Sequence, residues 1–121
     1  MQYQHEKLTY VELGSNALTL SKRFFSAVFD WQFSDYGPDY SAFDDQGLEG
    51  GLFQREEGAA PITGGALLIF YSHDLESTAA KITRHGGVIC KAIFDFPGGR
   101  RFHFYEPGGN ELAVWSDQPV V

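Results

Sequence analysis

The chain carries the same order of predicted elements twice, and this repeat constrains its fold more than any other feature. In the first half, residues 7–14 alternate as a strand, and residues 17–29 place apolar side chains at the three- and four-residue spacing of a helix. Alternating segments over 31–36, 40–44 and 48–54 then predict three short strands.

The second half repeats this order about fifty residues further along the chain. We expect an apolar strand over 66–71, a helix over 75–85 that is stopped by the glycines after it, and a strand over 88–94. Neither unit is expected to bury its sheet face alone. The two units are therefore predicted to pair, either within one chain or by exchange across a homodimer.

Residues 100–115 complete the second unit as a strand, a turn and a returning strand. Phe102 and Phe104 alternate with polar neighbours, so one face of the first strand packs and the other is free to bind. The segment Glu106–Asn110, which reads Glu-Pro-Gly-Gly-Asn, supplies the residues that a tight reversal needs.

Composition limits the functions that such a chain can have. Sixteen acidic residues against nine lysines and arginines give a net charge of −7, which argues against nucleic acid and favours a cationic ligand. The single cysteine excludes a disulfide framework and a thiolate metal cluster, and fits a reducing cytoplasm. Neither a signal peptide nor an apolar run of membrane-spanning length is expected.

We expect residues 1–121 to form a single domain. Its first module runs over about 7–54, a linker without periodicity over 55–63, and its second module over about 64–116. This assignment rests on the repeat and on the Gly-, Ala- and Pro-containing composition of the segment between the two units.

Two motifs and the repeat resemble the vicinal oxygen chelate superfamily, which includes glyoxalase I, bleomycin-resistance proteins and extradiol dioxygenases. The motifs are the run Phe24–Trp31 and the turn Glu106–Asn110. The resemblance implies an α+β fold in which two βαβββ modules form a curved, partly open mixed sheet around a cleft, with the helices on the outer face. It also implies a homodimer that binds a small molecule.

Enzymes of this superfamily hold a divalent metal ion with His and Glu side chains from the first and last strand of each module. At the matching positions this chain has Tyr10, Leu52 or Phe53, Leu67 and Ala113. Divalent cations need several converging oxygen or nitrogen donors. We therefore expect a degenerate metal site and no cofactor.

Seven residues of the predicted cleft face are expected to bind the ligand. They are Tyr10, Glu12, Leu67, Arg101, His103, Glu111 and Trp115. Glu12 and His103 are also the candidates for acid–base catalysis, because each can exchange a proton in a suitable environment. The structural alternatives are a salt bridge from Glu12 to Arg101 and a hydrogen bond from His103 to a neighbouring strand.

The remaining candidates carry similar alternatives. Arg101 can anchor a carboxylate or phosphate through its planar fork, or lie solvated at a strand edge. Trp115 and Tyr10 can stack on a planar ligand, or pack in the core or in a dimer interface. Cys90 is expected to be a small core residue on a half-buried strand rather than a nucleophile.

These observations favour a metal-independent small-molecule-binding protein with an aromatic-lined cleft and an unidentified ligand. Two alternatives stay open at this point. The first is a metal-dependent lyase, isomerase or dioxygenase-like enzyme of the same superfamily. The second is a protein with a vestigial cleft that acts through its dimer surface. The expected location is the cytoplasm.

Overall fold

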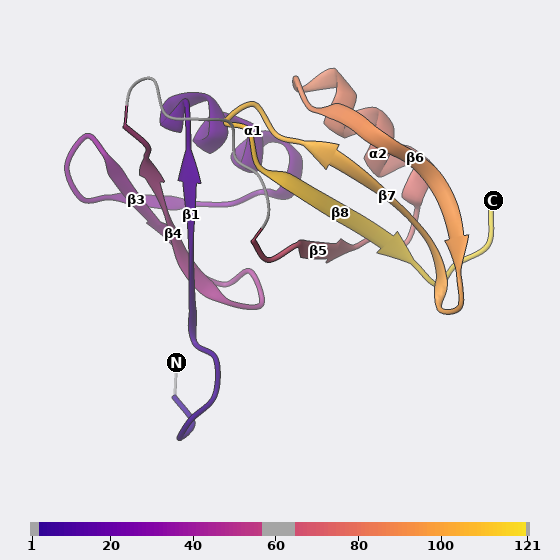
Figure 1. Ribbon diagram of the computed structural model, residues 1–121, viewed down its shortest axis with the longest axis horizontal. Coiled ribbons are helices and arrows are strands. Elements are labelled where there is room, and N and C mark those ends of the chain that lie inside the picture. The colour runs from indigo at the N-terminus through magenta and orange to yellow at the C-terminus, as the bar shows by residue number, and fades with distance from the viewer. Residues whose placement is uncertain (1–2, 57–64, 121) are drawn as a thin grey trace.

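The computed structural model describes residues 3–56 and 65–120, and in them the predicted repeat is confirmed (Figure 1). The first module contains β1 (Tyr10–Ser15), α1 (Leu18–Phe29), β2 (Phe33–Asp35), β3 (Tyr40–Phe43) and β4 (Glu49–Gln54). The second module contains β5 (Leu68–Tyr71), α2 (Leu75–Arg84), β6 (Val88–Phe96), β7 (Gly99–Tyr105) and β8 (Glu111–Ser116). None of the helices in these residues is long and apolar enough to cross a membrane.

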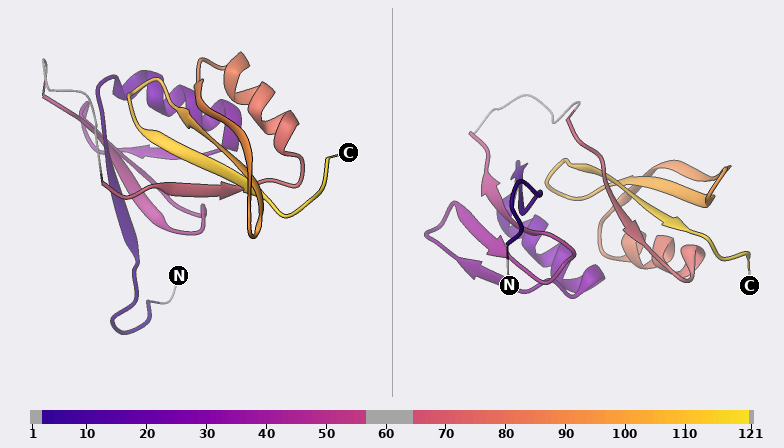
Figure 2. Two further views of the ribbon diagram at one scale, coloured as in Figure 1. Left: turned by 45° about the vertical axis from the view of Figure 1, so that its right-hand side comes forward. Right: turned by 90° about the horizontal axis from the view of Figure 1, so that it is seen from below.

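Each module forms its own four-stranded mixed sheet, so the fold is α+β as expected. The strand orders are β1-β4-β3-β2 and β5-β8-β7-β6, with β1–β4 and β5–β8 parallel and the other pairs antiparallel. In each sheet the first strand of the module therefore lies at an edge. Both helices lie on the same side of the two sheets, which leaves the other face of each sheet uncovered by helices (Figure 2).

Several predicted boundaries move by a few residues. The first strand begins at Tyr10 rather than at residue 7, and β6 continues to Phe96, beyond the predicted end at residue 94. β6 is longer because Asp95 and Phe96 still pair with Arg100 and Gly99 of β7. Residues 57–63 of the predicted linker 55–63 lie outside the described residues.

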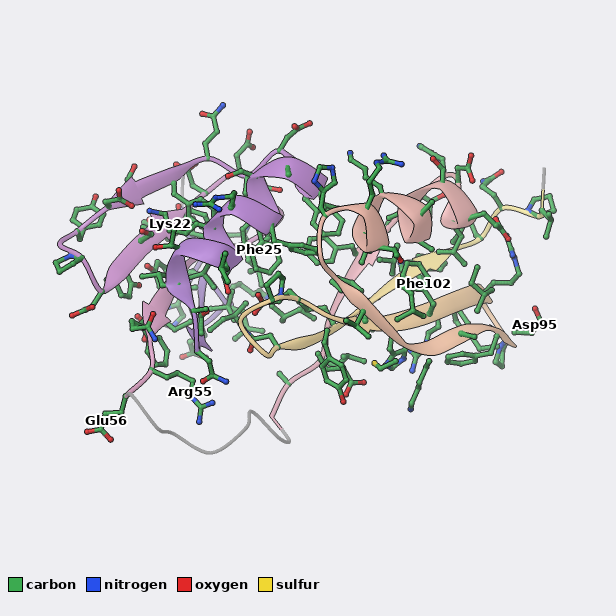
Figure 3. The ribbon with its side chains drawn as sticks, turned by 90° about the horizontal axis from the view of Figure 1, so that it is seen from above. Lys22, Phe25, Arg55, Glu56, Asp95 and Phe102 are labelled. Atoms are coloured by element: carbon green, nitrogen blue, oxygen red, sulfur yellow. The ribbon has the colours of Figure 1, made fainter. Side chains whose placement is uncertain are left out.

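Aromatic side chains of α1 join the two modules into one core. Phe29 stacks on Phe70 of β5 with ring centroids 4.0 Å apart, and Phe24 lies 5.9 Å from Phe104 of β7. Figure 3 shows Phe25 beneath α1 and Phe102 between α2 and the strands of the second sheet. Because α1 packs on both sheets, the second sheet cannot move away without exposing the core of the first module.

A buried carboxylate ties the turn between β7 and β8 to α1. Glu106 is only 2% exposed. Its Oε1 accepts hydrogen bonds from the Ser21 hydroxyl at 2.7 Å and from the backbone N–H of Gly108 at 2.6 Å. Its Oε2 accepts from the Asn110 side-chain amide at 2.7 Å. The carboxylate is thus satisfied by donors from both modules, as a buried charged group must be.

The same turn also holds the end of β1. The Asn110 amide donates to the carbonyl of Gly14 at 2.8 Å, and the N–H of Asn16 donates to the carbonyl of Gly108 at 2.9 Å. A Cβ on Gly108 would lie 2.1 Å from the Ser21 hydroxyl oxygen, so glycine is required for this close approach. The turn that the sequence shows as a local reversal is therefore also the contact between the modules.

We predict that Glu106→Gln lowers the free energy of unfolding by about 2–3 kcal/mol, because the new NH₂ group faces donors and leaves them unpaired. Urea unfolding followed by circular dichroism measures this change. Glu56→Gln is the matched control, because Glu56 is exposed just after β4. Equal unfolding free energies for the two variants would show that the turn does not hold the modules together.

Candidate functional site

The open face of the first sheet is set by the alternation of β1. Val11 and Leu13 pack against the core, and Tyr10 and Glu12 point to the opposite face. Tyr10 is paired with Glu49 of the parallel strand β4, so the two side chains lie next to each other on this face. The first sheet therefore presents aromatic and acidic groups where no helix covers it.

Three side chains on this face form a hydrogen-bonded chain. The hydroxyls of Tyr10 and Tyr40 are 2.5 Å apart, and the Tyr40 hydroxyl donates to Oε2 of Glu12 at 2.8 Å. Because Tyr40 has one hydroxyl proton and gives it to the carboxylate, Tyr10 must donate to Tyr40. Burial raises the pKa of the Tyr40 hydroxyl, and its hydrogen bonds to Tyr10 and Glu12 raise that pKa further.

Glycine in β4 makes room for this network. Gly51 is the partner of Glu12 in β1 and of Ala42 in β3. A Cβ on Gly51 would lie 2.1 Å from the Tyr40 hydroxyl oxygen. The small residue therefore allows the Tyr40 side chain to cross β4 and reach β1.

Beside the network lies a pocket of about 500 Å³. It is lined by Tyr10, Gln32, Ser34, Tyr36, Tyr40, Ala42, Phe43, Asp44 and Glu49. Three of these residues are tyrosines, two are acidic, and none of them is a lysine or arginine. Aromatic rings and carboxylates together suit a planar ligand with a positive charge.

The open face of the second sheet carries a histidine–glutamate pair. His103 Nδ1 and Glu111 Oε2 are 2.8 Å apart, across the paired strands β7 and β8. The other ring nitrogen of His103, Nε2, is buried and has no hydrogen-bond partner in the described part of the chain. This confirms the predicted bond from His103 to a neighbouring strand and leaves one ring nitrogen free.

Further along the same face, Arg101 lies against two phenylalanines. Its guanidinium carbon is 5.4 Å from the ring centre of Phe94 and 5.7 Å from that of Phe96. Trp115 is the partner of Arg101 in the strand pair β7–β8 and makes edge contact with Phe96. The second face therefore combines aromatic rings with a cation.

The structure divides the predicted site residues between the two sheets. Tyr10 and Glu12 lie on the first sheet. Arg101, His103, Glu111 and Trp115 lie on the second, and Leu67 lies just before β5, on the wall of a separate apolar pocket.

One structural alternative and one structural expectation for these residues are wrong. Glu12 bonds to Tyr40 rather than to Arg101, because β1 and β7 belong to different sheets. Cys90 is exposed rather than in the core, because its neighbour Ile89 packs against the core and strand alternation turns Cys90 to the opposite face.

Sequence reasoning missed Tyr40, Glu49 and Phe94. Tyr40 and Glu49 sit at the ends of predicted strands, and period-two alternation could have placed them on the open face once the partner strands were known. The contact of Phe94 with Arg101 could not have been found in this way, because it depends on the pairing of β6 with β7, which includes two register shifts.

The donors present do not fit the metal centre that the fold implies. The Tyr10 hydroxyl is bonded to Tyr40, and Ala113 is fully buried and offers no donor. Glu12 and Glu111, which are on different sheets, are each engaged by a neighbouring side chain. Within residues 3–56 and 65–120, no group of three His, Cys, Asp or Glu side chains is placed to hold a metal ion.

Comparison with known proteins shows which protein family this chain belongs to. The model of the glyoxalase/bleomycin resistance protein/dioxygenase superfamily matches residues 7–114. The chain belongs to this superfamily. The comparison with curated proteins finds no match. The resemblance seen in the sequence is therefore confirmed at the level of the superfamily.

Solved structures of this superfamily share the fold at low sequence identity. A glyoxalase-related enzyme from Fulvimarina pelagi is 16% identical with a TM-score of 0.77, over 92% of this chain and 88% of that one. A family enzyme from Burkholderia phytofirmans is 14% identical with a TM-score of 0.74, over 89% and 96%. The fosfomycin resistance protein FosX from Listeria monocytogenes, solved with Mn(II), is 15% identical with a TM-score of 0.73, over 93% and 90%.

From the donor set we predict that the protein, purified without chelators or metal-affinity steps, carries well under one Ni, Zn, Fe or Mn ion per chain. The physical reason is that too few free oxygen or nitrogen donors converge in the described residues. Elemental analysis by mass spectrometry measures the content. Near-stoichiometric metal would contradict this and would favour a metal-dependent lyase, isomerase or dioxygenase-like enzyme.

Proposed function

We propose that this member of the superfamily is a metal-independent small-molecule-binding protein, and that its ligand is a planar molecule with a positive charge. The observation that carries this proposal is the pocket on the open face of the first sheet. It is large enough for a small aromatic molecule and combines tyrosine rings with carboxylates. The net charge of −7 supports the same choice, because it attracts cations to the surface.

The hydrogen-bonded chain from Tyr10 to Glu12 is expected to fix the pocket wall. Tyr40 is held by bonds on both sides of its hydroxyl, so its ring has little freedom to move when a ligand binds. A preformed aromatic wall costs little conformational entropy on binding. Glu49 lies beside Tyr10, and its carboxylate accepts hydrogen bonds from the exposed Tyr3 hydroxyl. We expect this carboxylate to pair with the cation.

The proposed protein acts as a homodimer in the cytoplasm. Within the described residues, no strand pairs with the outer edges of β1 and β5. Next to these strands lies an apolar pocket of about 480 Å³ whose wall includes Val11, Trp31 and Leu67. Ile69 of β5 is 48% exposed beside this pocket. Apolar surface next to two free sheet edges favours association with a second copy. The lone free thiol is compatible with a reducing compartment.

Benzamidine, a planar aromatic cation, is a suitable first probe of the pocket. We predict that it binds the metal-free protein saturably and that Glu49→Gln weakens its binding by about tenfold, which corresponds to about 1.4 kcal/mol for one lost ion pair. Isothermal titration calorimetry measures both affinities.

Glu56→Gln serves as the matched control, since it removes an equal charge outside the pocket lining. Equal loss of affinity in both variants would mean that only the net charge matters. Absence of binding to the wild type would contradict the proposed ligand class.

The dimer proposal predicts that Ile69→Lys converts a dimer into a monomer, because a charge on the free edge strand is costly to bury. Sedimentation velocity measures the state of association. Leu20→Lys is the control, because Leu20 is similarly exposed but lies on α1. A monomeric wild type with ordinary stability would contradict the proposal.

A further inference from the structure

We propose that Arg101 is an anion-binding residue, which anchors the carboxylate or phosphate group of a small ligand on the open face of the second sheet. The site is separate from the tyrosine-lined pocket of the first sheet and does not depend on it. Nothing in the family membership assigns a role to Arg101. The inference rests on the surroundings of its guanidinium group.

Two consecutive arginines in β7 differ in the hydrogen-bond partners of their guanidinium groups. Arg100 points to the helix side, where its terminal nitrogens donate to both carboxylate oxygens of Glu76 in α2, at 2.5 and 3.2 Å. Arg101 points to the open face. Its guanidinium has no hydrogen-bond acceptor in the described residues, and its Nε is buried. The Nε of Arg100 is also buried without a partner, but its terminal nitrogens have a carboxylate partner, and the guanidinium of Arg101 has no acceptor in the described residues.

An unpaired arginine is unexpected in a chain with this charge balance. The sequence has sixteen acidic residues and nine lysines and arginines, so carboxylates are abundant. The carboxylate of Glu111 lies on the same face, but it is bonded to His103. A partly buried guanidinium without an acceptor is unfavourable, and an anionic ligand would remove that penalty.

Two aromatic rings hold the guanidinium in place. Phe94 and Phe96 lie 5.4 and 5.7 Å from its central carbon. Contact with ring faces stabilises the cation without using its N–H donors, which stay available for the two oxygens of a carboxylate or phosphate. Trp115, opposite Arg101 in the strand pair, offers a ring surface for an aromatic part of the ligand.

His103 adds a second free polar atom beside the same phenylalanine. Its ring centre is 5.9 Å from that of Phe94, and its Nε2 is buried without a partner in the described chain. The bond from Nδ1 to Glu111 fixes the orientation of the ring. Nε2 can donate to an oxyanion when it carries a proton or accept from a ligand hydroxyl when it does not.

The test uses sodium benzoate and inorganic phosphate as probes of the full-length protein, with benzyl alcohol as the neutral analogue. Binding is followed by the ¹⁵N–¹H signal of the Arg101 side-chain Nε and by Trp115 fluorescence. We expect at least one anion to shift the Nε signal saturably, and Arg101→Gln to weaken that binding at least tenfold. The matched control Arg84→Gln, at the exposed end of α2, should bind as the wild type does.

The relative affinities for the two anions distinguish between two classes of ligand. Stronger binding of benzoate supports an aromatic carboxylate, and stronger binding of phosphate supports a phosphate ester. Arg101→Lys should bind more weakly than the wild type, because lysine lacks the planar fork. The inference is overturned if neither anion shifts the wild-type Nε signal, if Arg101→Gln binds as well as Arg84→Gln, or if benzyl alcohol binds as tightly as benzoate. Benzamidine binding at Glu49 can succeed or fail independently of these results.

Discussion

The placement of the two modules depends on the buried carboxylate of Glu106. A carboxylate inside a protein is tolerated only when hydrogen-bond donors surround it, and here the donors come from Ser21 in α1 and from Gly108 and Asn110 in the turn. Because the donors belong to both modules, the turn must sit against α1. That contact sets α1 beneath both sheets and fixes which faces remain open.

The kinds of side chain on the two open sheet faces follow from strand alternation. The apolar side chains of β1 and β7 are used in the core, so their polar and aromatic neighbours face outward. Two positions at which the sequence predicts replaced metal ligands are Tyr10, which is hydrogen-bonded to Tyr40 on the first sheet, and Ala113, which is buried on the second. We therefore propose that binding in this chain uses aromatic rings, carboxylates and one arginine that has no acceptor among the described residues.

Much of the fold could be predicted from the sequence, because periodicity and turn residues are local signals. The alternation of Phe102 and Phe104 gave the correct core face of β7, and the turn at Glu106 was placed correctly. The bond from Glu106 to Ser21 spans 85 residues and has no local signal. The exposure of Cys90 follows from alternation with Ile89, but which face of β6 meets the core depends on the helix and strand packed beside it, and the strand's own sequence does not reveal this.

The central claim is that the open face of the first sheet binds its ligand without a metal ion. The most direct measurement is a benzamidine titration of ¹⁵N-labelled protein in EDTA, followed by amide chemical shifts and repeated after EDTA is replaced by Mn(II). The account predicts saturable shifts at Tyr10, Tyr40 and Glu49 that are the same in both conditions. Shifts that appear only with Mn(II), or that cluster away from these residues, would contradict it.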